Sequence, residues 1–307
     1  MKKKIYLILA IVIITLSIVL AGIYFVNKNK ISESNPLVLI DTAGKEVKLT
    51  KYPEKIISLI PAATENIYDL GAGEKLIAVD TYSNYPSATI ELTKLETASS
   101  LNIESIINLN PDIVFMSEMG QTVEQYENLT NSGIKIVMVD ASSIEETYTI
   151  INLIGKVIGK ENEAKEIINE MKTEFENIKN SVKDEKSKTI YYEVSPLEFG
   201  LWTSGNKTFE NEIMEILNIK NIFKDVDGWA QVSEEQVLVK DPQYIITTTA
   251  NYGDFDAVEE IISRENWKNV NAIKASNVYS INPDTMSRPT KRLVEGAKQL
   301  KNVIYGE

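Results

Sequence analysis

KIISLIPAATENIYDLGAGEKLIAVDTYSNYPSA, residues Lys55–Ala88, reads as a strand, a helix and a second strand. The first strand is expected at Ile56–Ile60, where a short apolar run ends at a proline. A helical pattern opened by Thr64-Glu65 follows at once, and two glycines end it. The second strand, Leu76–Val79, runs into the polar and aromatic loop Thr81–Pro86. This order of elements predicts an α/β fold.

The loop that ends this unit carries Tyr82 and Tyr85 and no side chain typical of catalysis. Open α/β sheets bind their ligands at the carboxyl ends of strands, and this loop leaves such an end. The stretch therefore predicts a surface that holds a molecule and does not transform it.

Composition limits the possible functions of the rest of the chain. A length of 307 residues suggests two domains of ordinary size. The formal net charge of −12 disfavours nucleic acid as a partner, because phosphate binding needs a concentrated basic face. Cysteine and histidine are both absent. Their absence excludes disulfides, thiolate metal sites, histidine-based catalytic triads and imidazole ligands to zinc or haem.

The N-terminal residues 1–30 predict a signal or transmembrane anchor. Three lysines precede Ile5–Val26, a run without charge that would be about 33 Å long as a helix, enough for a bilayer core of ~30 Å. A secretory apolar region is usually only about 7–15 residues long. We therefore expect residues 5–26 to remain as an uncleaved anchor, with the body on the outer, extracytoplasmic face of the cell membrane.

Two alternatives for this segment stay open. One is a cleaved signal peptide. The other starts from Leu20-Ala21-Gly22, which looks like the beginning of a bacterial lipoprotein cleavage box. Ile23 stands where the lipidated cysteine would follow, so this sequence cannot carry that lipid unless a native cysteine was substituted there.

The body alternates predicted strands and helices, which favours mainly parallel sheets covered by helices. Residues 31–36 form a linker, and Leu37–Leu49 resembles a hairpin with its turn at Ala43-Gly44. Further strands are expected at Ile113–Met116, Ile134–Val139, Ile190–Val194, Tyr244–Thr249 and Val278–Ile281, and helices at Ile103–Leu109, Val123–Ser132 and Phe209–Leu217. We assign residues 37–150 to an N-terminal α/β lobe and residues 187–307 to a C-terminal α/β lobe.

Residues 151–186, between these lobes, contain one long amphipathic helix. From Glu161 to about Lys183 the apolar residues recur at steps of three and four, without an interrupting glycine or proline. Such a helix could be a rigid strut that joins the two lobes. The alternative is an ordinary covering helix of one larger domain.

Several segments together resemble the iron-siderophore/cobalamin class of ABC-transporter substrate-binding proteins. The class is carried by Lys55–Ala88, Asn102-Ile103-Glu104, Asn110–Val114 and Gly133–Asp140. The cobalamin-binding branch is resembled most at Tyr82–Pro86, Thr203-Ser204-Gly205, Asn221–Asp225 and Trp229–Val237. The resemblance covers about residues 37–305.

The resemblance implies two α/β lobes bridged by one long rigid helix, with the ligand in the cleft between them. It implies a binding protein with no catalytic or metal-ligating residues and no intrinsic cofactor, because the cobalt of a corrinoid arrives with the ligand. The partners would be an ABC permease and its ATPase subunits. Members dock one acidic residue of each lobe into arginine pockets of the permease, and the matching positions are Glu104 and Glu235.

The same resemblance implies the ligand contacts. Tyr82 matches a ligand-contacting tyrosine, Trp229 a cleft tryptophan, and Trp202 falls near a cleft phenylalanine. Tyr85 is a further candidate, although its place before a proline suits a role in shaping the loop. Trp267 lies in a charged helical stretch and is expected to pack.

Asp284 and Arg288 follow the last predicted strand, in a loop whose counterpart in the cobalamin branch carries both residues near the ligand. An arginine on a proline-flanked loop suggests recognition of a carboxylate, phosphate or amide oxygen. The alternative is that the Arg288–Asp284 pair locks the loop. This sequence departs from the branch at Ala98 and Ser117, where two further cleft tryptophans are missing, and the segment Ser195–Gly200 could compensate.

The sequence thus predicts a membrane-anchored, extracytoplasmic importer component that binds a corrinoid. An iron-siderophore or haem is the alternative ligand, since tyrosine or methionine can ligate haem iron. Alternatives of another class are a membrane-tethered sensor and a cleft enzyme without a transporter.

Overall fold

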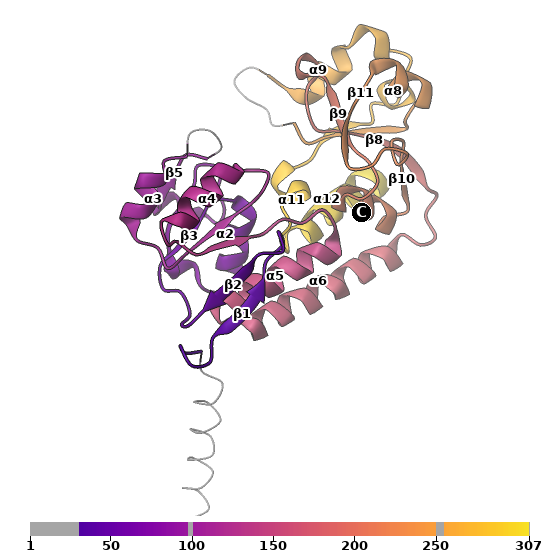
Figure 1. Ribbon diagram of the computed structural model, residues 1–307. Helices are drawn as coiled ribbons and strands as arrows, with labels where there is room; N and C mark the ends of the chain where they lie inside the picture. The colour runs from indigo at the N-terminus through magenta and orange to yellow at the C-terminus, as the bar shows by residue number, and fades with distance from the viewer. Residues whose placement is uncertain (1–30, 98–100, 250–254, 307) are drawn as a thin grey trace, which may run out of the picture.

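The computed structural model describes residues 31–97, 101–249 and 255–306. Within these ranges the chain forms two α/β lobes joined along their base by helices (Figure 1). The predicted anchor at residues 5–26 and Ala98 lie outside the described residues. No helix in the described part of the chain combines the length and apolar character that a membrane span requires.

The N-terminal lobe is built on a five-stranded parallel sheet in the order β5-β4-β3-β6-β7. Helices α2 and α5 cover one face of this sheet, and α3 and α4 cover the other. The alternation is visible in β3, where Ile56 faces the first layer and Ile57 the second. The elements of this lobe are β3 (Ile56–Ser58), α2 (Pro61–Asp69), β4 (Leu76–Asp80), β5 (Thr93–Leu95), α3 (Ile103–Leu109), β6 (Ile113–Met116), α4 (Val123–Asn131), β7 (Ile136–Met138) and α5 (Ile144–Ile158), with 3-10 turns at Gly73–Lys75 and Ser87–Glu91.

The predicted N-terminal hairpin is confirmed. Strands β1 (Leu37–Ile40) and β2 (Glu46–Leu49) pair antiparallel. The turn between them includes Gly44, whose φ of +73° is costly for residues with a Cβ. The Asp41 side chain accepts the backbone N–H of Met138 at 3.0 Å, which fixes the hairpin to the end of β7.

The C-terminal lobe repeats the parallel arrangement with four strands in the order β10-β8-β12-β13. A separate antiparallel ribbon, β9 with β11, lies beside this sheet. The elements are β8 (Lys188–Glu193), β9 (Leu201–Ser204), α7 (Phe209–Ile216), β10 (Ile219–Asn221), β11 (Trp229–Val232), α8 (Glu234–Lys240), β12 (Tyr244–Thr247), α9 (Ala257–Ser263), α10 (Asn271–Lys274), β13 (Val278–Ser280), α11 (Pro283–Ser287) and α12 (Leu293–Tyr305), with 3-10 turns at Leu197–Phe199 and Glu265–Trp267.

The predicted long helix is present as α6 (Glu161–Ser181) and runs beneath both lobes in Figure 1. It packs against α5 of the N-terminal lobe and against α7 and α12 of the C-terminal lobe. Its buried residues Ala164, Met171 and Phe175 belong to one continuous apolar core with residues of both sheets. A helix buried against both lobes is a strut between them, which decides against an ordinary covering helix of one domain.

Two local expectations are wrong. Helix α2 begins at Pro61 and not at Thr64-Glu65, because proline at the first helical position has its φ already fixed and loses no hydrogen bond. Glu65 is therefore placed in the second turn, where it is buried. The segment after β13 is not a plain loop, since Asn282 caps the short helix α11 by accepting the Asp284 N–H at 2.9 Å.

We predict that Gly155→Ala destabilises the protein. A Cβ at Gly155 would lie 2.7 Å from the Ala164 Cβ and 2.9 Å from the Lys160 carbonyl oxygen, so α5 and α6 would have to separate. Overpacking of this kind costs about 1–3 kcal/mol, which exceeds the gain of about 1 kcal/mol in helix propensity. Urea denaturation should show a net loss in the free energy of unfolding.

The matched control is Gly120→Ala, since the nearest atom to that Cβ would be the Leu59 carbonyl oxygen at 4.0 Å. Equal stability of the two variants would contradict the close approach of α5 and α6.

Candidate functional site

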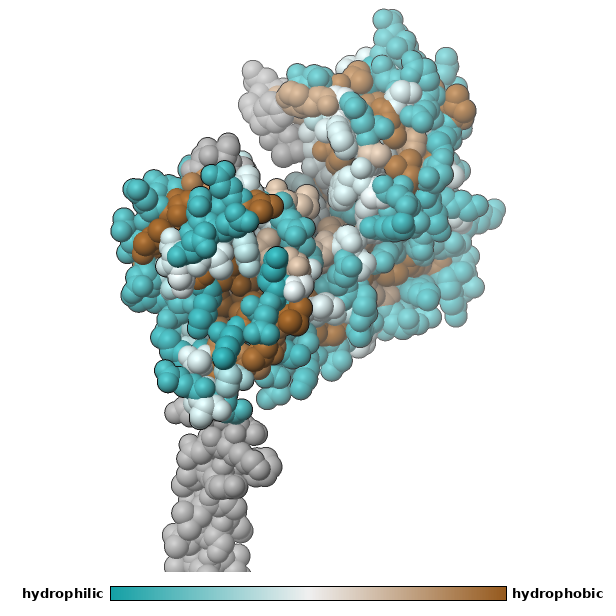
Figure 2. All heavy atoms as spheres, viewed as in Figure 1, coloured by the Kyte–Doolittle hydropathy of each residue, from teal (hydrophilic) through white to brown (hydrophobic). Residues whose placement is uncertain are grey.

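The carboxyl edges of the two parallel sheets face each other. The loop after β4 contacts the segment after β13 through Asn84, whose side-chain amide donates to Asp284 at 3.2 Å. Because strands of a parallel sheet all end at one edge, the loop after β8 leaves the C-terminal lobe on the side of the other lobe. Figure 2 shows the hollow that separates the lobes above this junction.

The loop that carries Tyr82 is held by polar contacts within its own lobe. Buried Asp80 accepts the backbone N–H of Tyr82 at 3.1 Å and the hydroxyl of Ser83. The Ser83 hydroxyl also lies 2.8 Å from that of Thr64 on α2. These contacts order the backbone and leave the Tyr82 side chain 69% exposed, available to a ligand.

Arg288 reaches this loop from the segment after β13. One terminal nitrogen, Nη1, donates to Glu65 Oε1 at 2.7 Å and to Asn84 Oδ1 at 2.8 Å. The other, Nη2, donates to the Tyr82 carbonyl oxygen at 3.3 Å and pairs with Asp284 Oδ1 at 2.8 Å. The predicted Asp284–Arg288 pairing is therefore present, within a larger set of contacts that also includes the N-terminal lobe.

Glu65 is the charged centre of this junction. Its side chain is fully buried, and its Oε1 also accepts from Arg292 at 3.1 Å while its Oε2 accepts the Thr290 hydroxyl at 3.2 Å. Burial raises the pKa of the Glu65 carboxyl, although Arg288 and Arg292 oppose the shift. Removing one partner of such a buried pair typically costs about 3–5 kcal/mol, because the other charge is left unpaired.

Two more contacts join α2 to the same C-terminal segment. The Asn66 side-chain amide donates to the Pro289 carbonyl oxygen at 3.1 Å, and Lys291 pairs with Asp69 at 2.9 Å. Helix α2 of one lobe is thus bound at successive positions to the chain that leaves β13 of the other.

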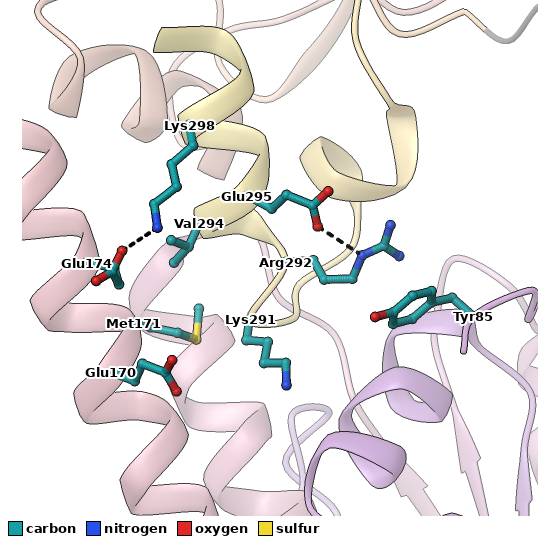
Figure 3. A pocket seen from close by; sticks show the side chains of 9 residues that line it. All are labelled: Tyr85, Glu170, Met171, Glu174, Lys291, Arg292, Val294, Glu295 and Lys298. Atoms are coloured by element: carbon teal, nitrogen blue, oxygen red, sulfur yellow. Dashed lines mark hydrogen bonds and ion pairs between the residues drawn. The ribbon is translucent and has the colours of Figure 1, made fainter. Parts of the chain in front are cut away.

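Tyr85 is placed differently from Tyr82. The guanidinium of Arg292 lies 4.1 Å from the centre of the Tyr85 ring, within the range of a cation–π contact. Figure 3 shows Tyr85 beside Arg292 at a second hollow of about 340 Å³, which α6 and α12 also line. The Lys298–Glu174 salt bridge crosses the other side of this hollow, between α12 and α6. The structure therefore places Tyr85 at the junction of the lobes and the long helix.

Trp202 and Trp229 share one face of the β9–β11 ribbon. Trp202 is directly opposite Gln231, and Trp229 is two residues from Gln231 on the same strand, so both indoles project to the same side. Diagonal neighbours of this kind are within reach of each other's aromatic rings. Their exposures of 40% and 42% leave a broad aromatic surface open to solvent.

Trp267 is fully buried, which confirms that it packs. Its indole N–H donates to Glu234 at 2.8 Å, and Arg264 lies 4.4 Å from the ring centre. Arg264 in turn makes a bidentate pair with buried Glu193 at 2.7 and 2.8 Å. This network attaches the first turn of α8 to the core of the C-terminal lobe.

Glu104 and Glu235 occupy the same place in matching helices. Each is the second residue of a seven-residue helix and is exposed to solvent. Both helices end at a residue with positive φ followed by a proline, which leads into β6 in one lobe and β12 in the other. The matched capping residues are Asn102 and Ser233 at the start, and Asn110 and Asp241 at the end.

Ser117 stands where a cleft tryptophan is missing, and the segment Ser195–Gly200 was expected to compensate for such losses. Ser117 is 1% exposed and donates its hydroxyl to Asp140 at 2.6 Å, so it supports the loop after β6 and forms no open wall. The segment Ser195–Gly200 places Phe199 at the surface with 68% exposure, next to the start of β9. Among the described residues, no group of three or more acidic side chains is arranged to hold a metal ion.

Sequence reasoning missed Glu65, Asn84 and Arg292. The usable signal was the choice of basic residue, because only three of the 32 basic residues are arginines and two of them lie in residues 288–292. Arginine is preferred over lysine where one cation must satisfy several fixed acceptors.

Comparison with known proteins agrees with this architecture. A family model for periplasmic binding proteins matches residues 56–285. The chain is 33% identical to an uncharacterized ABC transporter substrate-binding lipoprotein of Bacillus subtilis, over 89% of this chain and 87% of that protein. It is 30% identical to a vitamin B12-binding protein of Salmonella paratyphi A, over 81% of this chain and 90% of that protein.

A solved structure from Staphylococcus epidermidis, described as a possible iron-binding protein, superposes with a TM-score of 0.74 and 36% identity, over 83% of this chain and 100% of that chain. These matches confirm the resemblance on which the sequence reasoning relied. The chain belongs to the periplasmic binding protein family, as a substrate-binding component of an ABC transporter of the cobalamin, siderophore and haem class.

Proposed function

We propose that this protein is a membrane-anchored extracytoplasmic receptor that binds a corrinoid and delivers it to an ABC permease. The observation that carries the proposal is the pair of exposed aromatic surfaces on the two lobes, Tyr82 on one and Trp202 with Trp229 on the other. Aromatic faces with polar edges suit a large, flat ligand that is apolar on its surfaces and carries amides at its rim. Tyr85 is not counted among these aromatic surfaces, because its ring stacks on the guanidinium of Arg292.

The charges at the junction favour a ligand without a high negative charge. Arg288 donates to the Tyr82 carbonyl oxygen, and its charge is already paired with Glu65 and Asp284. An anionic ferric siderophore would have to compete with these carboxylates. Haem is also less favoured, because the chain has no histidine to ligate its iron.

The matching positions of Glu104 and Glu235 support a docking role. Exposed carboxylates at a protein interface mainly steer the encounter and fix orientation. One such group at the same helix position in each lobe would orient the receptor across both halves of a permease.

We predict that the purified protein binds cyanocobalamin or cobinamide with quenching of tryptophan fluorescence and a raised melting temperature. Trp202→Ala, Trp229→Ala and Tyr82→Ala should each weaken binding by about tenfold or more, as loss of a buried aromatic contact does. Tyr52→Ala is the control, since Tyr52 is a half-exposed tyrosine that packs beside Gly159 at the end of α5.

Ferric siderophores and haem are tested in the same assay. If a siderophore or haem binds at micromolar concentration and neither corrinoid does, the ligand assignment is wrong while the receptor role stands.

We predict that Glu104→Arg combined with Glu235→Arg abolishes ligand uptake by cells and leaves ligand affinity unchanged, because charge reversal opposes docking on a basic surface. The control is Glu124→Arg combined with Glu259→Arg, which reverses exposed glutamates in the first turns of α4 and α9. Normal uptake by the Glu104/Glu235 variant would exclude the docking role and favour a tethered sensor.

A further inference from the structure

Both terminal nitrogens of Arg288 are already engaged by other groups of the protein. Nη1 donates to two acceptors, while Nη2 donates to one acceptor and lies 2.8 Å from Asp284 Oδ1 in an ion pair. Only 12% of the side chain is exposed. All three hydrogen-bond acceptors belong to the N-terminal lobe, although Arg288 itself follows β13 of the C-terminal lobe.

The acceptors include the backbone of the residue that offers its ring to the cleft. Arg288 Nη2 donates to the Tyr82 carbonyl oxygen, and Nη1 donates to Asn84 two residues further along the same loop. Asn84 then donates to Asp284, so the loop is attached to the C-terminal segment from two directions. The backbone that carries the Tyr82 ring is thus held by the opposite lobe as well as by Asp80 of its own lobe.

Glu65 holds Arg288 in this place. The carboxylate is fully buried on α2 and faces the C-terminal segment, where its partners are Arg288, Arg292 and the Thr290 hydroxyl. A second arginine and a hydroxyl on the same carboxylate fix its orientation, so Arg288 is not free to turn toward the cleft.

We propose that Glu65, Asn84, Asp284 and Arg288 form an interlobe lock, in which Arg288 is a positioning residue and does not contact the ligand. The lock fixes the mutual orientation of the lobes and holds the Tyr82 loop in place relative to the C-terminal lobe. Pre-organisation of this kind lowers the ordering cost of binding. The effect on the ligand rests on the function proposed above, whereas the effect on the lobes does not.

The lock can be tested without any ligand, because the chain has no cysteine and can be spin-labelled at introduced ones. Labels at Glu124→Cys and Glu259→Cys, exposed positions in different lobes, report the distance between the lobes. We expect Glu65→Gln to broaden or shift this distance distribution in the full chain. Asn84→Ala, at an exposed loop position, should do the same to a lesser degree and is less disruptive to folding.

The matched control is Glu193→Gln, which also neutralises a buried arginine partner, but within one lobe. It should lower the melting temperature and leave the interlobe distance unchanged. An unchanged distribution in both Glu65→Gln and Asn84→Ala would overturn the lock.

Cyanocobalamin affinity separates a positioning role from direct contact. If the lock variant leaves a tenth of the molecules competent to bind, the apparent Kd rises tenfold, mainly through slower association. Direct contact predicts the opposite for Glu65→Gln, because an Arg288 released from its carboxylate would bind ligand as well or better.

A double-mutant cycle completes the test. Under the lock, Arg288→Met and Tyr82→Ala have non-additive effects on the Kd, since Arg288 acts through the Tyr82 loop. Additive effects, together with unweakened binding by Glu65→Gln, would assign Arg288 to the ligand. Absence of cyanocobalamin binding by the unaltered protein would reject the proposed ligand, and the distance measurement would still decide the lock.

Discussion

One continuous apolar core joins the two lobes, and the rest of the structure depends on it. The core extends from the inner face of the N-terminal sheet through α5, α6 and α12 to the inner face of the C-terminal sheet. Separate cores on the outer face of each sheet stabilise the lobes individually. Protein interiors are close-packed, so a shared core resists relative movement of the parts that contribute to it.

Apolar packing joins the two lobes at the base, and contacts between charged side chains join them on the side of the cleft. The apolar stripe of α6 ties the lobes together below, and the Glu65–Arg288 contacts tie them at the facing edges of the two sheets. The two attachments differ in kind. Packing is non-directional, whereas a guanidinium with three hydrogen-bond acceptors and an ion-pair partner depends on their geometry. Together they favour a receptor whose walls are placed before the ligand arrives.

Much of the fold could be predicted from the sequence because its signals are local. The stripe of α6, the hairpin turn at Ala43-Gly44 and the strand Ile113–Met116 follow from periodicity and turn chemistry, and all are confirmed. The start of α2 was misplaced because Thr64-Glu65 has the composition of a helix start, while the actual start is set by Pro61. The β9–β11 ribbon went unpredicted, since its strands are short and pair across a long connection.

The candidate site was predictable only in part, for a physical reason. Tyr82, Trp202 and Trp229 could be chosen because they match or lie near aromatic positions of the cobalamin-binding branch that the sequence resembles. The partners of a buried charge cannot be chosen this way, because Glu65 and Arg288 are 223 positions apart and meet only through the fold. A family match suggests where an arginine stands, and its hydrogen bonds decide whether its donors are available.

The repetition of α3 and α8 has a consequence for recognition. Glu104 and Glu235 stand at the same position of matching helices, one on each lobe, so the separation of their backbones changes when the lobes move relative to each other. A partner that binds both glutamates at once is therefore sensitive to the angle between the lobes. The surface that identifies the protein to such a partner would at the same moment report whether its cleft is open or closed.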